Sequence, residues 1–469
     1  MTKHTDTPAV GHSEVEADLN ADGTQRSLTT KDMRRILASS FMGSMIEFYD
    51  FMLYATASSI VFAHLYFSGL GPALSVFASF TTLAVGYLAR PLGGVIFGHF
   101  GDRVGRKAAM VTSMLIMGGV TVLIGVMPST AAIGVTAPIG LLVLRILQGI
   151  AVGGEWGGGA LMALEHAPKK KRGFAASFAN AGGPAGAVLA TLILSLMTVV
   201  TGENFLTWGW RIPFLFSAVL IVVGLVIRLK VSETPVFREM QEKEGERKAP
   251  ILVVLRHHLL PVLVGLLATI SVYTTQGLTT VWGVSVAVAA GEDKTSVLNI
   301  KALAAVLTMV VTFASARWGD RIGQRRMLIV ACVATALGAL PLTLLIVSGQ
   351  LGSFAVAIII GNGILQGLVY GPIAAYVSEL FPAAIRYTGA SLAYQTASAV
   401  GAGLSPMIAS ALMLIPGAGP FLIAGFWAVF AVAGALAVWG YRRPRGASGS
   451  VAGAAEVAAG ADVPTRAAV

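Results

Sequence analysis

The sequence has little charge and almost no cysteine. Asp, Glu, Lys and Arg make up 12% of its 469 residues, about half of their usual share in soluble proteins. The one cysteine, Cys332, lies in an apolar stretch, which excludes a disulfide framework and a thiolate metal site. The sequence shows no phosphate-loop lysine motif, nucleophile–base pair or His-rich set, so we expect no enzyme, no cofactor and no metal. The net charge of +10 is spread over short loops, which does not indicate a nucleic-acid partner.

Long apolar stretches fill the chain instead. Apolar residues make up 55% of it, the mean hydropathy is +0.76, and there are 55 glycines. About 20 consecutive apolar residues are enough to cross a bilayer as a helix, and small residues let such helices pack closely. We predict an all-α membrane protein with twelve transmembrane helices in two pseudo-symmetric six-helix halves. The predicted spans lie near residues 36–62, 75–98, 108–127, 136–164, 174–200, 212–230, 259–289, 297–317, 327–348, 353–377, 388–414 and 419–440.

Polar segments divide the chain. We predict a disordered cytoplasmic tail at 1–30, an N-terminal half at 31–230, a cytoplasmic linker at 231–258, a C-terminal half at 259–440 and a disordered cytoplasmic tail at 441–469. The first tail has no apolar core like that of a cleaved signal peptide. Loops on the side of the termini hold most of the basic residues, so the positive-inside rule places both termini in the cytoplasm.

A repeat relates the two halves. The triplet Gly-Asp-Arg at 101–103 recurs 218 residues later at 319–321, each time within a basic turn. The tetrad Ile-Leu-Gln-Gly recurs at the same offset, at 146–149 and 364–367. Two unrelated matches at one offset indicate that the chain contains two related units.

The basic turns are predicted to act as gates that hold the cytoplasmic side shut. A carboxylate beside a glycine turn can pair with an arginine or cap the start of a helix. The pattern Glu-x-x-Pro-x-x-x-Arg at 165–172 and 379–386 suggests ion pairs next to these turns. Plain positive-inside loops and solvated surface charge are the alternatives. The predicted gating residues are Asp102, Arg103, Arg106, Glu165, Asp320, Arg321, Glu379 and Arg386.

Two arginines inside the predicted spans indicate an anionic substrate. A charge near the bilayer centre is costly and is therefore a functional candidate. Arg90 lies 12 residues before Asp102, which is about 18 Å along a helix, and Arg145 is likewise well inside the fourth span. Because a guanidinium stays protonated and binds a carboxylate through two hydrogen bonds, these arginines are predicted to hold the substrate. Gln148 and Tyr54 are predicted to bind it beside them.

Three carboxylates are candidates for carrying protons. Glu47 and Asp50 fall on one face of the first span, and Glu155 falls on the stripe of the fourth span that begins at Arg145. A buried carboxyl group beside a mobile cation can exchange a proton near neutral pH. The alternative is a set of static ion pairs, such as Glu47 with Arg90 or Asp50 with Arg145, that stabilises the bundle.

The second half lacks these charges. At the 218-residue offset, the positions of Glu47, Asp50, Arg90 and Arg145 hold Gly265, Ala268, Thr308 and Gly363. We therefore predict that the second half lines the substrate site with neutral groups, with packing between helices as the alternative for each. The candidates are Tyr273, Gln276, Gln366, Tyr370, Tyr394 and Gln395. Lys301, at the start of the eighth span, is predicted to lie at the outer rim.

Several stretches resemble motifs of a known family. The turn at 98–107, Gly-His-Phe-Gly-Asp-Arg-Val-Gly-Arg-Lys, and the Arg-x-x-Gln-Gly of 145–149 resemble signatures of the major facilitator superfamily. Glu-Phe-Tyr-Asp-Phe at 47–51, Arg-Pro-Leu-Gly-Gly at 90–94 and Gly-Gly-Glu-Trp-Gly at 153–157 are similar to its metabolite:proton symporter family. That family includes bacterial transporters of shikimate, α-ketoglutarate, citrate, dicarboxylates and proline/betaine, of which the shikimate transporters look most similar.

The resemblance implies a secondary transporter that works by alternating access and is driven by the proton gradient. We expect it to import a small organic acid (a shikimate-like acid, a keto acid or a dicarboxylate) with protons. The expected setting is the bacterial inner membrane, with one chain surrounded by lipid acting as a monomer. The alternatives are a betaine or proline importer, an exporter on the same fold, and a membrane sensor that does not transport.

Overall fold

The computed structural model describes residues 18–19, 25–26, 30–67, 69, 72–230 and 250–441. Most of both predicted tails, and residues 231–249 of the predicted linker, lie outside the described residues. Two short strands, β1 (Asp18–Leu19) and β2 (Gln25–Arg26), pair antiparallel before the first helix. From Thr30 onward the described chain is helical, with short connections between the helices.

The N-terminal half consists of long helices joined by short turns. Its longest helix has 32 residues, which is about 48 Å and more than the roughly 30 Å of a hydrocarbon core. The elements are α1 (Thr30–Ala57), the π-helix η1 (Ser58–Phe62), α2 (Ala63–Tyr66), α3 (Pro72–Arg103), α4 (Arg106–Val126), α5 (Thr130–Ile133), α6 (Thr136–His166), η3 (Lys169–Lys171), α7 (Arg172–Thr201), η4 (Gly202–Phe205) and α8 (Arg211–Leu229).

The C-terminal half repeats this plan with more interruptions. A short helix, α10 (Pro250–His257), falls in the described part of the predicted linker. The remaining elements are α11 (Leu259–Gln276), η5 (Gly277–Trp282), α12 (Gly283–Ala289), α13 (Lys294–Ile322), α14 (Gln324–Val347), α15 (Leu351–Ile358), η6 (Ile359–Gln366), α16 (Gly367–Glu379), η7 (Ala383–Ile385), α17 (Arg386–Ser398), η8 (Ala399–Leu404), α18 (Ser405–Met413) and α19 (Gly419–Gly440).

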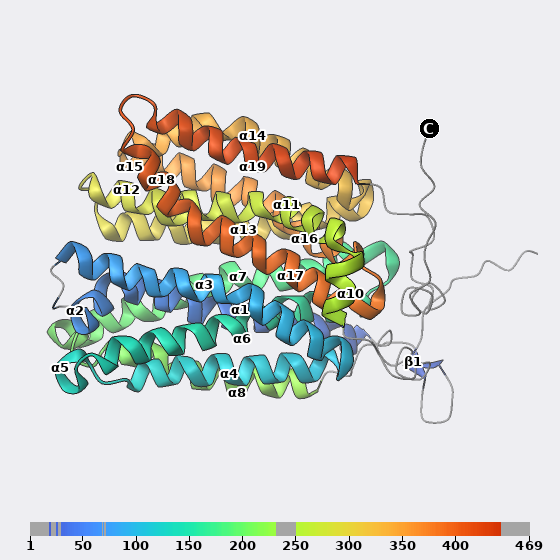
Figure 1. The fold of residues 1–469 in the computed structure, drawn as a ribbon, viewed down its shortest axis with the longest axis horizontal. Helices are drawn as coiled ribbons and strands as arrows, with labels where there is room; N and C mark the ends of the chain where they lie inside the picture. Colours follow the sequence, from blue (N-terminus) through green and yellow to red (C-terminus); the bar gives the residue numbers. More distant parts are fainter. Residues whose placement is uncertain are drawn as a thin grey trace, which may run out of the picture.

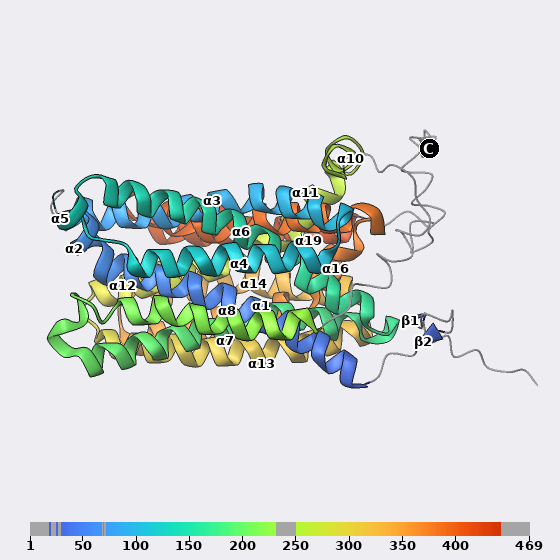
Figure 2. The same ribbon diagram turned by 90° about the horizontal axis from the view of Figure 1, so that it is seen from below.

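Ten helical runs among the described residues are long and apolar enough to cross a membrane. Helices α1 and α3 run beside them over the same length (Figure 1), which gives twelve crossings in the described part of the chain. In Figure 1 the first half forms the lower layer and the second half the upper layer. Figure 2, a quarter turn away, shows the same nearly parallel packing. The predicted all-α, twelve-helix fold class is confirmed.

The outer surface of the bundle is apolar. On α19, Phe421, Val429 and Trp439 are each at least 60% exposed, whereas Trp427 and Ala431 are fully buried. The buried face packs against α11 and α14. The apolar face that points outward is stable in contact with lipid tails, because in water it would be solvated at a large free-energy cost.

The largest buried cluster lies along the boundary between the halves. It contains Phe51 and Tyr87 from the first half and Tyr370 and Tyr394 from the second. A second buried cluster, around Tyr49 and its neighbours, belongs to the first half alone. The aromatic residues of the first cluster therefore belong to the interface that must rearrange if the halves move against each other.

Glycine makes both basic turns possible. Gly105, between α3 and α4, has a φ angle of 133°, and Gly323, between α13 and α14, has a φ angle of 97°. Both angles lie in the region that residues with a Cβ atom avoid. The turns predicted from the repeat therefore occur at corresponding places in the two halves.

The structure corrects one part of the repeat. The basic turns are 218 residues apart, so α3 and α13 correspond at that offset. A Cβ atom on Gly153 would meet the Arg90 carbonyl, and one on Gly367 would meet the Thr308 carbonyl, so Gly153 corresponds to Gly367. The predicted match of Gly149 with Gly367 is wrong by four residues, about one helical turn. Small residues recur at each turn of both helices, which is why a sequence match can slip in this way.

π-Helical segments interrupt four of the described spans. Two of them, η1 and η5, lie at corresponding places in the first span of each half. The other two, η6 and η8, occur in the tenth and eleventh spans, whereas the corresponding α6 and α7 are regular. A π-turn widens a helix, changes which side chains share a face, and often accompanies a functional site. The second half is therefore the less regular one near its centre.

Candidate functional site

Two arginines of the first half meet at one phenylalanine ring. The guanidinium carbon atoms of Arg90 and Arg145 lie 4.2 Å and 4.1 Å from the ring centroid of Phe51. Tyr87 packs edge-on against Phe51, and its ring centroid lies 4.6 Å from the Arg90 carbon. The ring centroid of Tyr54 lies 4.1 Å from the Arg145 carbon. Because aromatic faces attract cations, these buried rings help to hold both arginines in place.

Glu47 is the carboxylate paired with Arg90. Its Oε1 atom lies 3.8 Å from Arg90 Nη1, and its Oε2 atom has no hydrogen bond in the described part of the chain. Arg90 Nη1 also donates to Ser398 Oγ of the second half, at 3.4 Å. Glu47 and Arg90 are each only 2% exposed. The pair is therefore loose, although unpaired polar atoms are costly at such a buried place.

No arginine in the described part of the chain forms an ion pair with Asp50. Its Oδ1 atom accepts a hydrogen bond from Ser217 Oγ at 2.5 Å, and its Oδ2 atom accepts one from Thr121 Oγ1 at 2.9 Å. Gln148 Nε2 donates to Thr121 Oγ1 at 2.7 Å, and Arg145 Nη1 donates to Gln148 Oε1. Three hydrogen bonds therefore link Asp50 to Arg145 through two neutral side chains. Of the two ion pairs weighed as an alternative, Glu47 with Arg90 is present, whereas Asp50 and Arg145 are linked only through Thr121 and Gln148.

Glu155 lies apart from these groups. Its Oε1 atom forms an ion pair with Arg228 Nη2 of α8. Its Oε2 atom accepts hydrogen bonds from Arg228 Nη1 at 2.8 Å and Ser113 Oγ at 3.3 Å. Arg228 Nη1 also donates to the Met110 carbonyl at 2.7 Å. Both Glu155 oxygens are therefore held by a cation of the same half, and this two-point contact ties α6 to α8.

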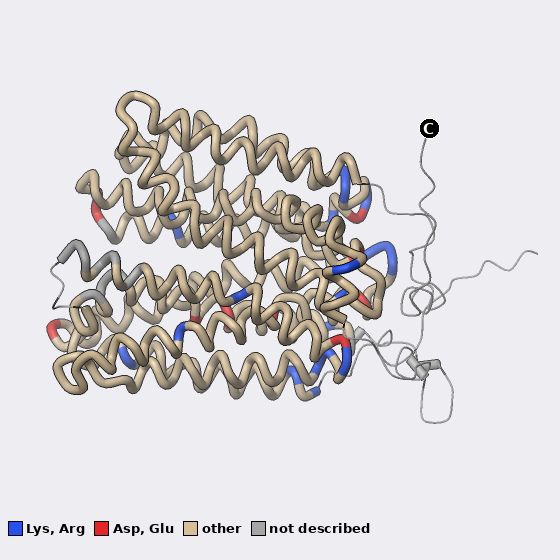
Figure 3. The backbone as a smooth tube through the Cα atoms, in the orientation of Figure 1, with Lys and Arg blue, Asp and Glu red and all other residues tan. Residues whose placement is uncertain are grey.

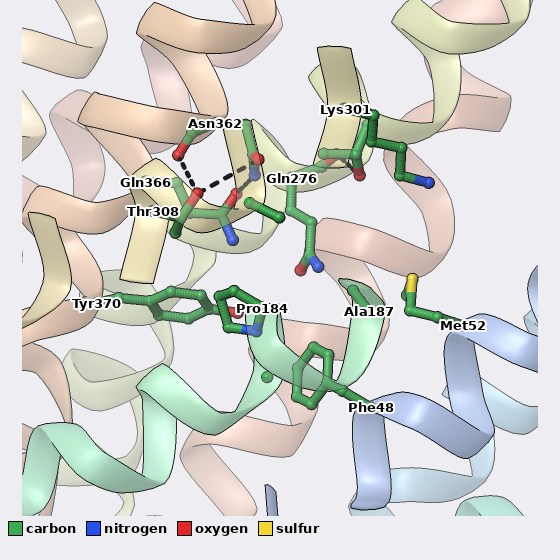
Figure 4. A pocket seen from close by; sticks show the side chains of 13 residues that line it. Phe48, Met52, Pro184, Ala187, Gln276, Lys301, Thr308, Asn362, Gln366 and Tyr370 are labelled. Carbon is green, nitrogen blue, oxygen red and sulfur yellow. Dashed lines mark hydrogen bonds between the residues drawn. The ribbon is translucent and has the colours of Figure 1, made fainter. Parts of the chain in front are cut away.

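A cavity of about 40 Å³ lies between the two halves (Figure 4). Its first-half wall is apolar and consists of Phe48, Met52, Gly183, Pro184 and Ala187. Its second-half wall is mainly polar and consists of Gln276, Thr280, Lys301, Ala305, Thr308, Asn362, Gln366 and Tyr370. Figure 4 shows Gln276 extending across the cavity toward Phe48 and Ala187. A cavity of this size holds a few water molecules at most, so its walls must move apart before they can orient a small molecule that has one apolar and one polar side.

Three of the six neutral residues predicted in the second half line this cavity, namely Gln276, Gln366 and Tyr370. Asn362, one turn before Gln366, donates a hydrogen bond to the Gln366 side chain. The four first-half residues predicted to bind substrate do not line the cavity in this state. Arg90, Arg145, Gln148 and Tyr54 lie in the buried charged cluster instead.

The other three predicted residues, Tyr273, Tyr394 and Gln395, pack between the halves on the side of the basic turns. The Tyr394 ring stacks on Trp156 of the first half, with ring centroids 3.4 Å apart, and Tyr273 packs edge-on against Tyr394. Gln395 Nε2 donates to first-half carbonyl oxygens of α6 at 3.4 Å. Asn180 accepts a hydrogen bond from Trp156 Nε1 at 2.7 Å. These contacts close the space between the halves on the side of the cavity that faces the basic turns.

Two aspartates bind the starts of helices in the opposite half. Asp102 accepts hydrogen bonds from the backbone N–H groups of Tyr387 and Thr388, at 3.2 Å and 2.9 Å, where α17 begins. Asp320 accepts them from the backbone N–H groups of Gly173 and Phe174, at 2.9 Å each, where α7 begins. A helix start carries a partial positive charge that attracts a carboxylate. Each half therefore binds the other through an aspartate at the end of the bundle that carries the basic turns.

A buried ion-pair network strengthens the contact at Asp102. Glu165 forms ion pairs with Arg106 of its own half and with Arg386 of the other half, the latter at 3.0 Å. Each of these side chains is at most 9% exposed. We call Asp102, Arg106, Glu165 and Arg386 the first latch.

We call Asp320, Gln324 and Glu379, which stand at the corresponding places in the other half, the second latch. Its contact between the halves is weaker. Gln324 stands where the first latch has Arg106, and its Nε2 atom donates to Asp320 Oδ1 at 2.8 Å. Glu379, which corresponds to Glu165, is partly exposed and is in none of the ion pairs found in the described part of the chain. Asp320 itself is partly exposed, whereas Asp102 is buried.

Two predicted gating residues lie outside both latches. Arg103 and Arg321 are exposed, and Arg103 Nη1 lies 3.4 Å from His99 Nε2 on its own helix. Both positions fit the alternative of plain surface charge. Figure 3 shows that Lys and Arg gather at this end of the bundle.

Sequence reasoning misplaced Lys301. Its distance from Asp320 along the chain led us to expect it at the outer rim, but it lines the cavity. The useful signal is the face of the helix: Lys301, Ala305 and Thr308 stand at i, i+4 and i+7 and all line the cavity. The partners of the buried charges, such as Thr121, could not be found from spacing, because they come from other helices.

Comparisons with known proteins fit this architecture. The family model described as Major Facilitator Superfamily matches residues 40–406. The Escherichia coli inner membrane metabolite transport protein YhjE is 38% identical over 405 residues, covering 85% of this chain and 92% of that protein. The Escherichia coli shikimate transporter is 36% identical over 417 residues, covering 87% and 94%. The solved structure of the proton:xylose symporter XylE bound to 6-bromo-6-deoxy-D-glucose has a TM-score of 0.75 at 16% identity, covering 88% and 96%.

These findings agree with the twelve-helix bundle. The apolar helices and the inner-membrane relative make the protein a multi-pass inner-membrane protein. Relatives named as transporters make it a transport protein for a small molecule rather than an enzyme. The chain therefore belongs to the major facilitator superfamily and, within it, to the metabolite:proton symporter family.

Proposed function

We propose that this protein imports a small organic acid together with protons by alternating access. The observation that carries the proposal is the buried cluster of Glu47, Asp50, Arg90 and Arg145 in the first half, beside a cavity between the halves. Charges at this depth are costly, and so they need a function that keeps them there. A proton and an anion that enter together neutralise each other, which lets such a cluster load both without a net buried charge.

Asp50 and Glu47 are the proposed proton carriers. A carboxyl group can bind and release a proton, whereas a guanidinium stays charged. Protonation of Asp50 removes the charge that Arg145 balances through Gln148. Arg145 also has two nitrogen atoms, Nε and Nη2, without a hydrogen-bond partner in the described part of the chain. It is therefore available to attract an anion once Asp50 is neutral.

Arg90 is the proposed link between the charged cluster and the movement of the halves. It pairs loosely with Glu47 in its own half and donates a hydrogen bond to Ser398 in the other. Rocking of the halves changes the second contact directly. The charge state of Glu47 and the conformation of the transporter are coupled in this way.

The two latches are the proposed cytoplasmic gate. Both join the halves at the end where the basic residues gather (Figure 3), and the positive-inside rule makes that end cytoplasmic. Helix α1 begins and α19 ends there as well (Figure 1), so both termini are cytoplasmic in this proposal. One chain contains both halves of the pathway, which supports a monomer surrounded by lipid.

Uptake into liposomes tests the proposal. Purified protein is reconstituted, and uptake of labelled shikimate, α-ketoglutarate and betaine is followed with and without an inside-alkaline gradient. We expect accumulation of an acid that requires the gradient. Accumulation of betaine alone would indicate a compatible-solute importer, and gradient-driven efflux an exporter. Saturable binding without flux would indicate a sensor.

A further inference from the structure

We propose that Lys301 binds the carboxylate of the substrate and so selects anions. The amide side chains beside it, Gln276, Asn362 and Gln366, then bind oxygen atoms elsewhere on the same molecule. The substrate class is a small monocarboxylate that carries hydroxyl or carbonyl oxygens. This inference rests on the proposed function and deepens it by naming the charge that the cavity recognises.

The first observation is the face of α13 on which Lys301 lies. Lys301 lines the cavity together with residues four and seven positions later. The opposite face of the same helix points outward, with Leu303, Val306 and Val310 exposed by 59%, 43% and 56%. A lysine that only anchors a helix to the membrane surface runs along the lipid-facing side. Lys301 instead lies at the edge of the cavity, on the face of α13 that lines it (Figure 4).

The second observation is that Lys301 lacks a counter-ion. It takes part in none of the ion pairs found in the described part of the chain. No aspartate or glutamate lines the cavity, and the facing wall is made of Phe48, Met52, Pro184 and two small residues. Lys301 is partly exposed, and a cation beside such an apolar wall loses part of its hydration without gaining a counter-ion. A substrate carboxylate is the group that can do so.

The third observation is the balance of charge near the cavity. In the first half, Glu47 and Asp50 match Arg90 and Arg145 in number. Lys301 adds one positive charge from the second half that this cluster does not balance. A substrate carboxylate balances this charge at the cavity itself, while a proton that enters with it is held in the first half, which favours an anion over a neutral solute.

The remaining polar groups fit the rest of such a molecule. Gln276 Oε1 is buried and has no hydrogen-bond partner in the described part of the chain, and Figure 4 shows this side chain in the middle of the cavity. Asn362 and Gln366 form the adjoining wall. Amides both donate and accept hydrogen bonds, so they can bind hydroxyl and carbonyl oxygens alike. The apolar wall opposite suits the carbon skeleton.

The test removes the positive charge of Lys301 and the negative charge of the ligand in turn and compares the effects on binding affinity. Binding of labelled shikimate and pyruvate to purified protein is measured, with their uncharged methyl esters as competitors. The wild type should bind at least one acid about 10-fold or more tightly than its ester, as expected for a desolvated charge pair. Lys301→Met should lower the affinity for the acid by about the same factor and leave that for the ester unchanged.

Two further variants act as controls. Arg326→Gln removes an exposed positive charge from the same half and should keep the acid-to-ester ratio of the wild type. Lys301→Arg keeps the charge and should retain a preference for the acid, which also covers the case in which Lys301→Met does not fold. Equal loss of acid and ester binding in Lys301→Met, or loss of the preference in Lys301→Arg, would overturn the proposal.

Uptake separates this inference from the proposed function. If the wild type prefers an acid to its ester through Lys301 but never accumulates the acid under an inside-alkaline gradient, the transport function fails and the binding role stands. If the wild type accumulates an acid and Lys301→Met keeps the preference, the binding role fails and the function stands. A wild type that binds neither acid overturns the assignment of Lys301.

Discussion

The two halves of this transporter share their latches and differ in their interiors. Asp102 and Asp320 bind the starts of α17 and α7 in the same way. The interior of the first half holds two carboxylates and two arginines, whereas the second half presents amides, hydroxyl groups and Lys301 to the cavity. The difference suggests a division of labour, with proton chemistry in the first half and recognition of substrate oxygens in the second.

Confining the charged cluster to one half has a physical advantage. A buried charge that loses its partner is strongly destabilising. Because Glu47, Asp50, Arg90 and Arg145 belong to one half, rocking of the halves does not separate them. The hydrogen bond from Arg90 to Ser398 crosses the boundary between the halves. Because Ser398 is neutral, this bond can break when the halves move without leaving a charge unbalanced.

The largest effect is expected from Arg145→Ala. The substitution leaves Asp50 without its balancing cation and removes the proposed attraction for the anion. A lost buried pair is worth about 3 kcal/mol or more, so we expect uptake to fall roughly 100-fold or more. The matched control is Ile359→Ala, which should transport nearly as well as the wild type. In the corrected register of α6 and the tenth span, Ile359 rather than Gly363 corresponds to Arg145. Normal uptake by Arg145→Ala would remove this arginine from the mechanism.

Neutralising Asp50 or Glu47 should abolish the coupling of transport to the proton gradient but leave the movement of acid across the membrane intact. Asp50→Asn keeps the hydrogen bonds with Ser217 and Thr121 possible but cannot carry a proton. We expect exchange of labelled for unlabelled acid to persist, while accumulation driven by the gradient falls to the equilibrium level. Glu47→Gln should act in the same direction. Full gradient-driven accumulation by both variants would move the proton carrier elsewhere.

Glu155→Gln should affect stability more than coupling. It leaves Arg228 buried without its carboxylate, which costs about 3–5 kcal/mol in comparable cases, so the unfolding temperature should fall. Adding Arg228→Gln should restore part of the loss, because no unpaired charge then remains. The folded protein should still accumulate acid under the gradient. A stable Glu155→Gln variant that exchanges acid but no longer accumulates it would make Glu155 the carrier.

The sequence predicted the fold well, for a simple reason. Apolar length and the sign of loop charges depend on the bilayer rather than on packing details, so the twelve spans and the intramembrane charges could be read directly. The partners of those charges could not. Arg145 is held by two aromatic rings and by Gln148, and Arg228, the partner of Glu155, lies at the end of a span where sequence alone reads it as an anchoring charge.

The same limit explains the two misplaced features. The Ile-Leu-Gln-Gly match slipped by one turn because closely packed helices repeat small residues at every turn, and only the facing carbonyl groups fix the register. Lys301 was placed by its distance along the helix, whereas the direction in which its face points decides its role. Both features depend on which neighbouring helix lies opposite, and that is a property of the tertiary structure.

Unequal latches should open unequally. Asp102→Asn weakens a buried contact supported by Arg106, whereas Asp320→Asn weakens a partly exposed one. With Cys332 replaced by alanine, labelling of a cysteine introduced at Ser391 reports opening of the cytoplasmic side, because Ser391 of α17 lies against Gly94 of α3. We expect labelling to rise about 10-fold in Asp102→Asn and about threefold in Asp320→Asn, as expected for lost helix-start contacts. The reverse order would contradict the ranking of the latches.

The smallest effect is expected from Gln324→Arg, which gives the second latch the cation that the first one has. The new guanidinium can bind Asp320 and pair with Glu379. Because this site is partly exposed, the gain should be modest, and labelling at Ser391 should fall by about twofold. Faster labelling would show that the arginine of the first latch does not stabilise the closed state.

Proton movement measured directly tests the division of labour most sharply. A pH-sensitive dye outside the liposomes follows protons while an acid that the wild type transports is added. The wild type should make the outside medium alkaline as the acid enters. The double variant Glu47→Gln with Asp50→Asn should let the acid equilibrate without this signal. Proton uptake of normal size by the double variant would contradict the claim that the first half carries the protons.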